Sequence, residues 1–220
     1  MLNLLVDFRQ RLATMARLID IHPDNPQPRR IAEVVATLRS GGLIAYPSDS
    51  SYALGWHMGD QKAIKEVQRI RKTDKQHNFT LVCRDLSELA NYARVENWAY
   101  RLLKSHTPGP YTFILEATRE VPRRLLNPKR KTIGLRVPDH PVPLAMLEAL
   151  GEPMMSSSLI LPGEDMPLTD PSEILHRLGK DLHTIIDSGN CGIDPTTVVD
   201  LTGDFPVVLR QGKGDVTDFA

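Results

Sequence analysis

The sequence lacks the features of several common protein classes. It has only two cysteines in 220 residues, Cys83 and Cys191. So few cysteines, so far apart, predict neither a disulfide scaffold nor a zinc site, and they fit a reducing compartment. No apolar run approaches the roughly 18 residues that cross a bilayer. We therefore expect a soluble, cytoplasmic protein.

Three kinds of catalytic motif are also missing. Neither G-x-x-x-x-G-K-[ST] nor G-x-G-x-x-G occurs, which weakens ordinary kinase, NTPase and dinucleotide-binding interpretations. The seven histidines form no H-x-x-x-H or H-E-x-x-H pair, and no serine lies in G-x-S-x-G. We therefore expect neither a protein-held metal nor a covalent nucleophile.

The composition is that of an ordinary globular protein, with 41% hydrophobic and 25% charged residues. At this length we expect one domain, over residues 15–220. Residues 1–14 are a poor signal peptide, since no basic region or cleavage site flanks their short apolar stretch. They are either a short extra helix at the N-terminus or a segment that precedes the natural start at Met15.

Charge is balanced overall but uneven along the chain. The formal net charge is +0, so composition alone gives no reason to expect a nucleic-acid partner. One basic run lies between Glu120 and Asp139 and contains Arg123, Arg124, Lys129, Arg130, Lys131 and Arg136. A second cluster contains Arg69, Arg71, Lys72 and Lys75. Each is either a solvated face or part of a binding surface.

Hydrophobic periodicity and turn residues predict an α/β fold with a twisted, mixed sheet and flanking helices. The predicted helices cover residues 28–40, 60–72, a stretch from 85, 98–105, 141–150 and 172–178. The predicted strands cover residues 43–46, 78–83, 111–115, 131–137, 153–157, 183–187, 196–201 and 206–210. The hairpin-like spacing of the last two strands argues against a purely parallel sheet.

The most informative segment is Gly41–Gly55. Residues 43–46 form an apolar run between a glycine and Pro47, which predicts a strand buried on both faces. The hydroxyl-rich residues 48–52 follow directly. Because ligands often bind at the carboxyl ends of strands in open α/β sheets, we interpret residues 47–55 as a loop at a binding site.

Polar residues lie at the ends of several other predicted strands. The set comprises Ser50, Thr112, Ser156, Ser158, Thr196, Arg136 and Arg210. If these ends converge, the hydroxyls and guanidinium groups suit phosphates and carboxylates. In the alternative interpretation, the hydroxyls cap turns and the arginines form surface ion pairs.

Together these segments resemble the YrdC-like family, whose best-known members are threonylcarbamoyl-AMP synthases of tRNA modification. The resemblance rests on five segments that occur in the family's order: residues 41–55, 107–112, 133–141, 195–200 and 209–212. Residues 71–81 and 121–126 resemble the YciO branch of that family. The resemblance implies a mixed sheet around a basic, concave cavity.

The family's reaction uses ATP, L-threonine and bicarbonate, with Mg²⁺ carried on the nucleotide phosphates. By this resemblance Ser50, Arg136, Ser156 and Thr196 would face the amino acid. Arg71, Lys72, Thr112, Ser158 and Arg210 would face the nucleotide. Catalysis would consist mostly of positioning and charge stabilisation, so no covalent nucleophile is implied.

The sequence departs from the family pattern at several positions. The lysine and arginine of the K-x-R element become Arg71 and Thr73, an amide of the S-x-N element becomes Ile160, and Cys83 replaces a common histidine. Two alternatives to the synthase therefore stay open. One is a protein that binds double-stranded RNA, tRNA or the ribosome through basic residues such as Arg123, Arg124 and Lys131. The other is a carboxylate- or nucleotide-binding protein with another acceptor.

Overall fold

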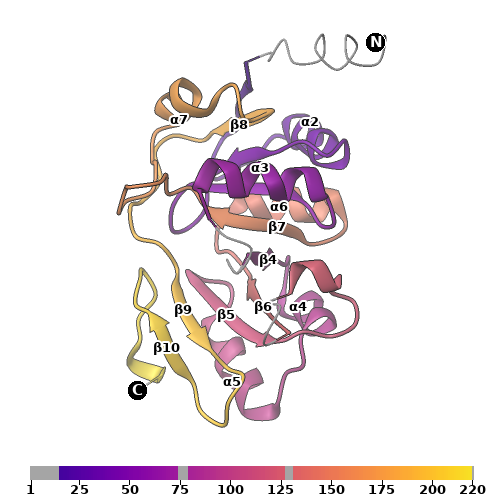
Figure 1. The fold of residues 1–220 in the computed structure, drawn as a ribbon, viewed down its shortest axis with the longest axis vertical. Helices are drawn as coiled ribbons and strands as arrows, with labels where there is room; N and C mark the ends of the chain where they lie inside the picture. Colours follow the sequence, from indigo (N-terminus) through magenta and orange to yellow (C-terminus); the bar gives the residue numbers. More distant parts are fainter. Residues whose placement is uncertain (1–14, 74–78, 127–130, 220) are drawn as a thin grey trace.

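A single mixed sheet of ten strands organises the described part of the chain, which in this computed structural model comprises residues 15–73, 79–126 and 131–219 (Figure 1). In spatial order the strands are β1 (Arg17–Asp20), β8 (Thr184–Asp187), β2 (Ile44–Tyr46), β3 (Ala53–His57), β7 (Met154–Ser158), β4 (Thr80–Val82), β6 (Thr132–Arg136), β5 (Tyr111–Glu116), β9 (Thr197–Asp200) and β10 (Val207–Arg210). Four neighbouring pairs are parallel: β1–β8, β2–β8, β4–β6 and β5–β9. The other five are antiparallel, including the predicted hairpin of β9 and β10. The predicted mixed sheet is confirmed.

Helices cover both faces of this sheet. They are α2 (Pro28–Arg39), α3 (Gln61–Arg71), α4 (Leu86–Tyr92), α5 (Asn97–His106), α6 (Pro141–Leu150) and α7 (Pro171–Leu178), with short 3₁₀ turns at Arg123–Leu125 and Thr217–Phe219. The apolar sides of α2 and α6 share one core with Ile44, Met154 and Ile186 of the sheet. The other helices pack into a larger core on the opposite face. No helix among the described residues is long and apolar enough to span a membrane.

Two strands were not predicted from the sequence. β3 lies inside the segment that we interpreted as a loop, and it pairs with β2 as an antiparallel hairpin. Four of its five residues are buried in succession, so it shows no alternation of polar and apolar residues. β1 is a short strand that, among the described residues, lies at the edge of the sheet and pairs with β8. The hydroxyl-rich loop is therefore confined to residues 47–52.

The shortness of β4 opens the sheet locally. Thr80, its first residue, pairs with Ser156 of β7 on one side and Gly134 of β6 on the other. β7 continues beyond that point to Ser158, and β6 begins two residues earlier, at Thr132. The two neighbours of β4 therefore both extend past its first residue at this end of the sheet.

Candidate functional site

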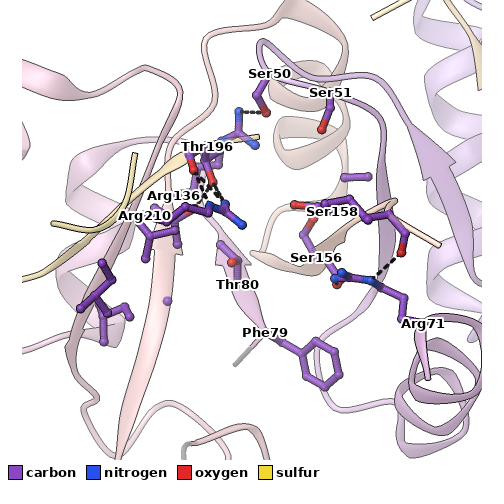
Figure 2. A pocket seen from close by; sticks show the side chains of 18 residues that line it. Ser50, Ser51, Arg71, Phe79, Thr80, Arg136, Ser156, Ser158, Thr196 and Arg210 are labelled. Atoms are coloured by element: carbon purple, nitrogen blue, oxygen red, sulfur yellow. Dashed lines mark hydrogen bonds between the residues drawn. The ribbon is translucent and has the colours of Figure 1, made fainter. Parts of the chain in front are cut away.

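A cavity of about 280 Å³ lies over this opening. Its size lies just below the roughly 300–1,000 Å³ that is typical of small-molecule sites. The lining comprises Ser50, Ser51, Ala53, Arg71, Phe79, Thr80, Thr112, Ile114, Gly134, Arg136, Ser156, Ser157, Ser158, Ile160, Thr196, Val198, Leu209 and Arg210. Among these described residues there are three arginines and no carboxylate. Figure 2 shows the arginines and hydroxyls pointing inward from opposite sides.

Strand alternation explains which side chains reach the cavity. On β5, Thr112 and Ile114 face it, whereas Phe113 between them is in the core of the opposite face. On β4, Thr80 faces the cavity, and Val82 two residues later packs against the α2/α6 layer. The cavity therefore lies on the α2/α6 face of the sheet, at the point where that helical layer ends.

Arg136, the last residue of β6, forms a buried ion pair with Asp49. One Nη2 atom donates to Asp49 Oδ1 and, at 3.2 Å, to Ser50 Oγ. Arg136 is only 6% exposed, and a cation at that depth requires a partner. Arg136 Nε and Asp49 Oδ2 have no hydrogen-bond partner among the described residues. The pair thus fixes the loop that carries Ser50 against the sheet.

Ser48 holds the same loop from within. Its Oγ donates to the backbone oxygen of Ser51 at 2.7 Å and accepts from the amides of Ser50 and Ser51, both at 3.3 Å. Such side-chain bonds to nearby backbone groups stabilise tight turns. The Ser48 and Ser50 hydroxyls lie 3.1 Å apart. Ser50 is therefore held between Ser48 and Arg136.

Arg210 and two threonines form the opposite wall. Arg210, on β10, donates to the backbone oxygen of Thr196 through Nε at 3.1 Å and Nη2 at 2.8 Å. The same Nη2 donates to Thr196 Oγ1, which lies 3.0 Å from Thr112 Oγ1. These contacts join β10 and β5 through Thr196, the residue that precedes β9.

Arg71 is the last residue of α3, and its side chain reaches the cavity next to the end of β7. Its guanidinium donates to Ser157 Oγ at 2.6 Å and to the backbone oxygen of Ile160 at 3.1 Å. Burial lowers the pKa of Arg71, and the positive charge of Arg210 lowers it further. Burial also lowers the pKa of Arg210. Two desolvated cations that repel each other across one cavity favour an anionic ligand.

The predicted site residues largely converge. Ser50, Arg136, Ser156, Thr196, Arg71, Thr112, Ser158 and Arg210 all line the cavity. Lys72 does not, because it forms the C-cap of α3 in a left-handed conformation (φ 47°) and is exposed. Lys75, Lys129, Arg130 and residues 1–14 lie outside the described residues.

Sequence reasoning missed other parts of the site. The sequence assigns no role to Asp49, the partner of Arg136, and Thr80 and Ser157 are not among the predicted site residues. Alternation along the strand at 78–83 could have indicated Thr80, whereas nothing local indicates that Asp49 pairs with Arg136. Of the four positions that depart from the family pattern, Arg71 and Ile160 line the cavity, whereas Thr73 and Cys83 do not.

The basic residues suggested for RNA binding lie elsewhere. Arg123 and Lys131 are exposed and do not line the cavity. The side chain of Arg124 is outside the described part of the structure. RNA binding therefore stays a prediction that is independent of the cavity.

Comparison with known proteins identifies close and distant relatives. The chain is 57% identical over 205 residues to the uncharacterized protein YciO of Escherichia coli, covering 93% of this chain and 100% of YciO. The crystal structure of E. coli YciO matches with a TM-score of 0.91 at 56% identity, over 94% of this chain and all of that one.

More distant relatives have stated activities or ligands. The chain is 28% identical over 195 residues to the threonylcarbamoyl-AMP synthase of Bacillus subtilis, covering 88% of this chain and 55% of the synthase. The crystal structure of P. abyssi Sua5 complexed with L-threonine has a TM-score of 0.81 at 26% identity, over 89% of this chain and 57% of Sua5. This chain thus spans little more than half of each of these two proteins.

A family model covers most of the chain. The Sua5/YciO/YrdC model, which carries the description "Telomere recombination", matches residues 36–212. That range includes every cavity residue described above. The chain therefore belongs to the Sua5/YciO/YrdC family.

Proposed function

We propose that the protein is an ATP-dependent nucleotidyltransferase of the threonylcarbamoyl-AMP synthase type. The observation that carries this proposal is the division of the cavity into two electrostatic ends. Asp49 neutralises Arg136 at one end, whereas two further guanidinium groups, those of Arg71 and Arg210, lie at the other end. A locally neutral end suits a zwitterionic amino acid, and a doubly cationic end suits nucleotide phosphates.

The stated activity of the distant B. subtilis relative and the L-threonine in P. abyssi Sua5 support the same assignment. In the proposed reaction, the threonine amine attacks bicarbonate to form a carbamate, and water leaves. A carbamate oxygen then attacks the α-phosphorus of ATP, and pyrophosphate leaves. The products are threonylcarbamoyl-AMP, pyrophosphate and water, and the first is an activated donor suited to tRNA threonylcarbamoyladenosine modification.

The chain's residues would act by holding and neutralising the reactants. Arg71 and Arg210 would stabilise negative charge on the phosphates and on the departing pyrophosphate. Ser50, Arg136, Ser156 and Thr196 would orient the amino acid, and Thr112 and Ser158 would contact the nucleotide. Positioning of this kind needs no covalent intermediate.

The side chains of the cavity do not fit a magnesium ion held by the protein itself. Mg²⁺ prefers carboxylate ligands, and the described lining offers hydroxyls and guanidinium groups instead. The arrangement fits an ion that enters with ATP and is held by its phosphates. No residue of the site is assigned to it.

Pyrophosphate release from ATP, measured with threonine and bicarbonate, tests the proposal. We expect release that depends on threonine, and a loss of about 10- to 100-fold on Arg210→Gln, since a charged contact to the phosphates disappears. Arg29→Gln is the matched control, because Arg29 is an exposed arginine on α2. Absence of threonine-dependent release at high protein concentration, beside an active synthase, would refute the proposal.

RNA binding is a second candidate, favoured by the exposure of Arg123 and Lys131. If both contact phosphates of an RNA duplex, replacing both with glutamine should reduce the slope of log affinity against log salt by about 2. The measurement is RNA binding at several salt concentrations. An unchanged slope would exclude this surface as the footprint.

A further inference from the structure

Tyr46 lies behind the cavity at the end of β2. Its side chain is 1% exposed and does not line the cavity. In the sheet, Tyr46 pairs with Ala53 of β3, and Gly55 two residues further on pairs with Ser156 of β7. The Tyr46 ring lies over Gly55, where an added Cβ would be 3.0 Å from ring atoms Cδ1 and Cε1. Because Gly55 has no side chain, the Tyr46 ring can cross β3 and reach Ser156.

The Tyr46 hydroxyl meets Ser156 Oγ at 2.7 Å. Either oxygen could donate on distance alone. However, Ser156 is the one hydrogen-bond partner of the Tyr46 hydroxyl among the described residues. If Ser156 donated, the phenolic proton would be buried without an acceptor, which is unfavourable. Burial also raises the pKa of Tyr46, more than the charge of Arg136 lowers it, so the phenol keeps its proton.

We propose that Tyr46 is a positioning residue that donates to Ser156 and thereby turns the Ser156 hydroxyl proton into the cavity. Ser156 lines the cavity, and its outward proton is then available to an anionic oxygen of the ligand. Without Tyr46, the same hydroxyl would rotate freely between donor and acceptor orientations. The ligand's identity, a threonine carboxylate or an ATP phosphate, rests on the proposed function, whereas the direction of the proton does not.

If Tyr46 orients the Ser156 hydroxyl toward the ligand, its loss should weaken binding. Equilibrium binding measured by calorimetry, with L-threonine and with ATP–Mg²⁺ as separate probes, tests this. We expect Tyr46→Phe to weaken binding of one of the two probes by about 3- to 10-fold, since one oriented hydrogen bond to a charged group is disturbed. Ser156→Ala should weaken the same probe at least as much. The double variant should bind it no more weakly than Ser156→Ala alone, because Tyr46 acts through Ser156. Additive losses in the double variant would overturn the proposal.

Tyr111→Phe is the matched control. Tyr111 is also buried, its hydroxyl donates to the backbone oxygen of Asp215 at 3.1 Å, and it does not line the cavity. This variant should lower stability without changing either dissociation constant. An equal loss of affinity in Tyr111→Phe would mean that Tyr46→Phe acts through general destabilisation, and would count against the proposal.

A neutron crystal structure of the deuterated wild-type protein provides a test without any ligand. We expect the Tyr46 deuteron between Tyr46 Oη and Ser156 Oγ, and the Ser156 deuteron on the cavity side. A Ser156 deuteron directed at Tyr46 would overturn the proposal. If the wild-type protein binds neither probe, the proposed function fails, and the neutron structure still decides the role of Tyr46.

Discussion

Arg136 and Asp49 are 87 residues apart in the chain and form an ion pair in which both side chains are less than 10% exposed. Ser50 accepts from the same guanidinium nitrogen. A ligand at this end of the cavity therefore meets a cation whose charge is already compensated. The pair stabilises the loop that carries Ser50, and Arg71 and Arg210 supply the other two guanidinium groups of the cavity.

Removing the Asp49 carboxylate should lower the stability of the folded protein. Asp49→Asn leaves a buried guanidinium without its counter-charge, so we expect a loss of about 3–5 kcal/mol in the free energy of unfolding. Urea denaturation measures this loss. Asp181→Asn, which breaks the exposed pair with Arg69, should cost less than about 1 kcal/mol. The double variant Asp49→Asn/Arg136→Gln should be more stable than Asp49→Asn alone; a further loss would argue against charge pairing as the cause.

Pyrophosphate should stabilise the protein through Arg71 and Arg210. Both guanidinium groups are desolvated, and binding of an anion between them relieves their repulsion. At 100 times its dissociation constant a ligand adds about 2.7 kcal/mol to the unfolding free energy. Thermal unfolding in pyrophosphate, against sodium chloride of equal ionic strength, checks this. Arg71→Gln and Arg210→Gln should each reduce the shift, whereas Arg29→Gln should keep it; an undiminished shift in the first two would show that the anion binds elsewhere.

A methyl group at position 55 should disturb the contact between Tyr46 and Ser156. In Gly55→Ala, the new Cβ would crowd the Tyr46 ring, and overpacking of this kind costs about 1–3 kcal/mol. We expect a loss of stability by urea denaturation and a loss of affinity for the same probe that Tyr46→Phe affects. Gly203→Ala should change neither, since the nearest atom to its added Cβ is at 3.9 Å. Full retention of affinity in Gly55→Ala would contradict this prediction.

Alkaline pH should destabilise the protein partly through Cys83. Burial raises the pKa of this thiol well above its usual value of 9.0. The folded protein therefore retains a proton that the unfolded chain loses, and the stability this provides is fully present below pH 9.0 and declines above it. From about pH 8 to about pH 10, one such group removes about 1 kcal/mol.

Urea denaturation at both pH values, on the wild type and Cys83→Ala, isolates this contribution. The variant should be less stable at the lower pH, because it loses buried volume, but should decline less as the pH rises. Parallel declines in the two proteins would assign the pH dependence to other groups.

Strand composition and alternation along the sequence predicted the site residues that lie on regular strands. Thr112, Ser156 and Arg136 lie on strands whose composition is distinctive, and alternation then places them on one face. Lys72 does not line the cavity, because it adopts the left-handed conformation that ends α3. The sequence does not show that conformation. β3 escaped prediction because it is buried on both faces and interrupted by Gly55.

These local patterns do not predict contacts between residues that are far apart in the sequence. The hydroxyls of Tyr46 and Ser156 meet across 110 residues of chain, and their approach depends on strand order and on Gly55. Asp49 and Arg136 meet because the loop after β2 folds toward the end of β6. The sequence indicates which residues are polar at strand ends, but only the three-dimensional pairing shows which of them neutralise or orient one another.

The three-residue length of β4 has an evolutionary consequence. A longer β4 would complete the ladders with β6 and β7 and would gain backbone hydrogen bonds, so selection for stability alone favours its extension. That extension would occupy the space over which the cavity lies. Variants of this protein selected for heat resistance should therefore leave the β4 boundary at Thr80 unchanged.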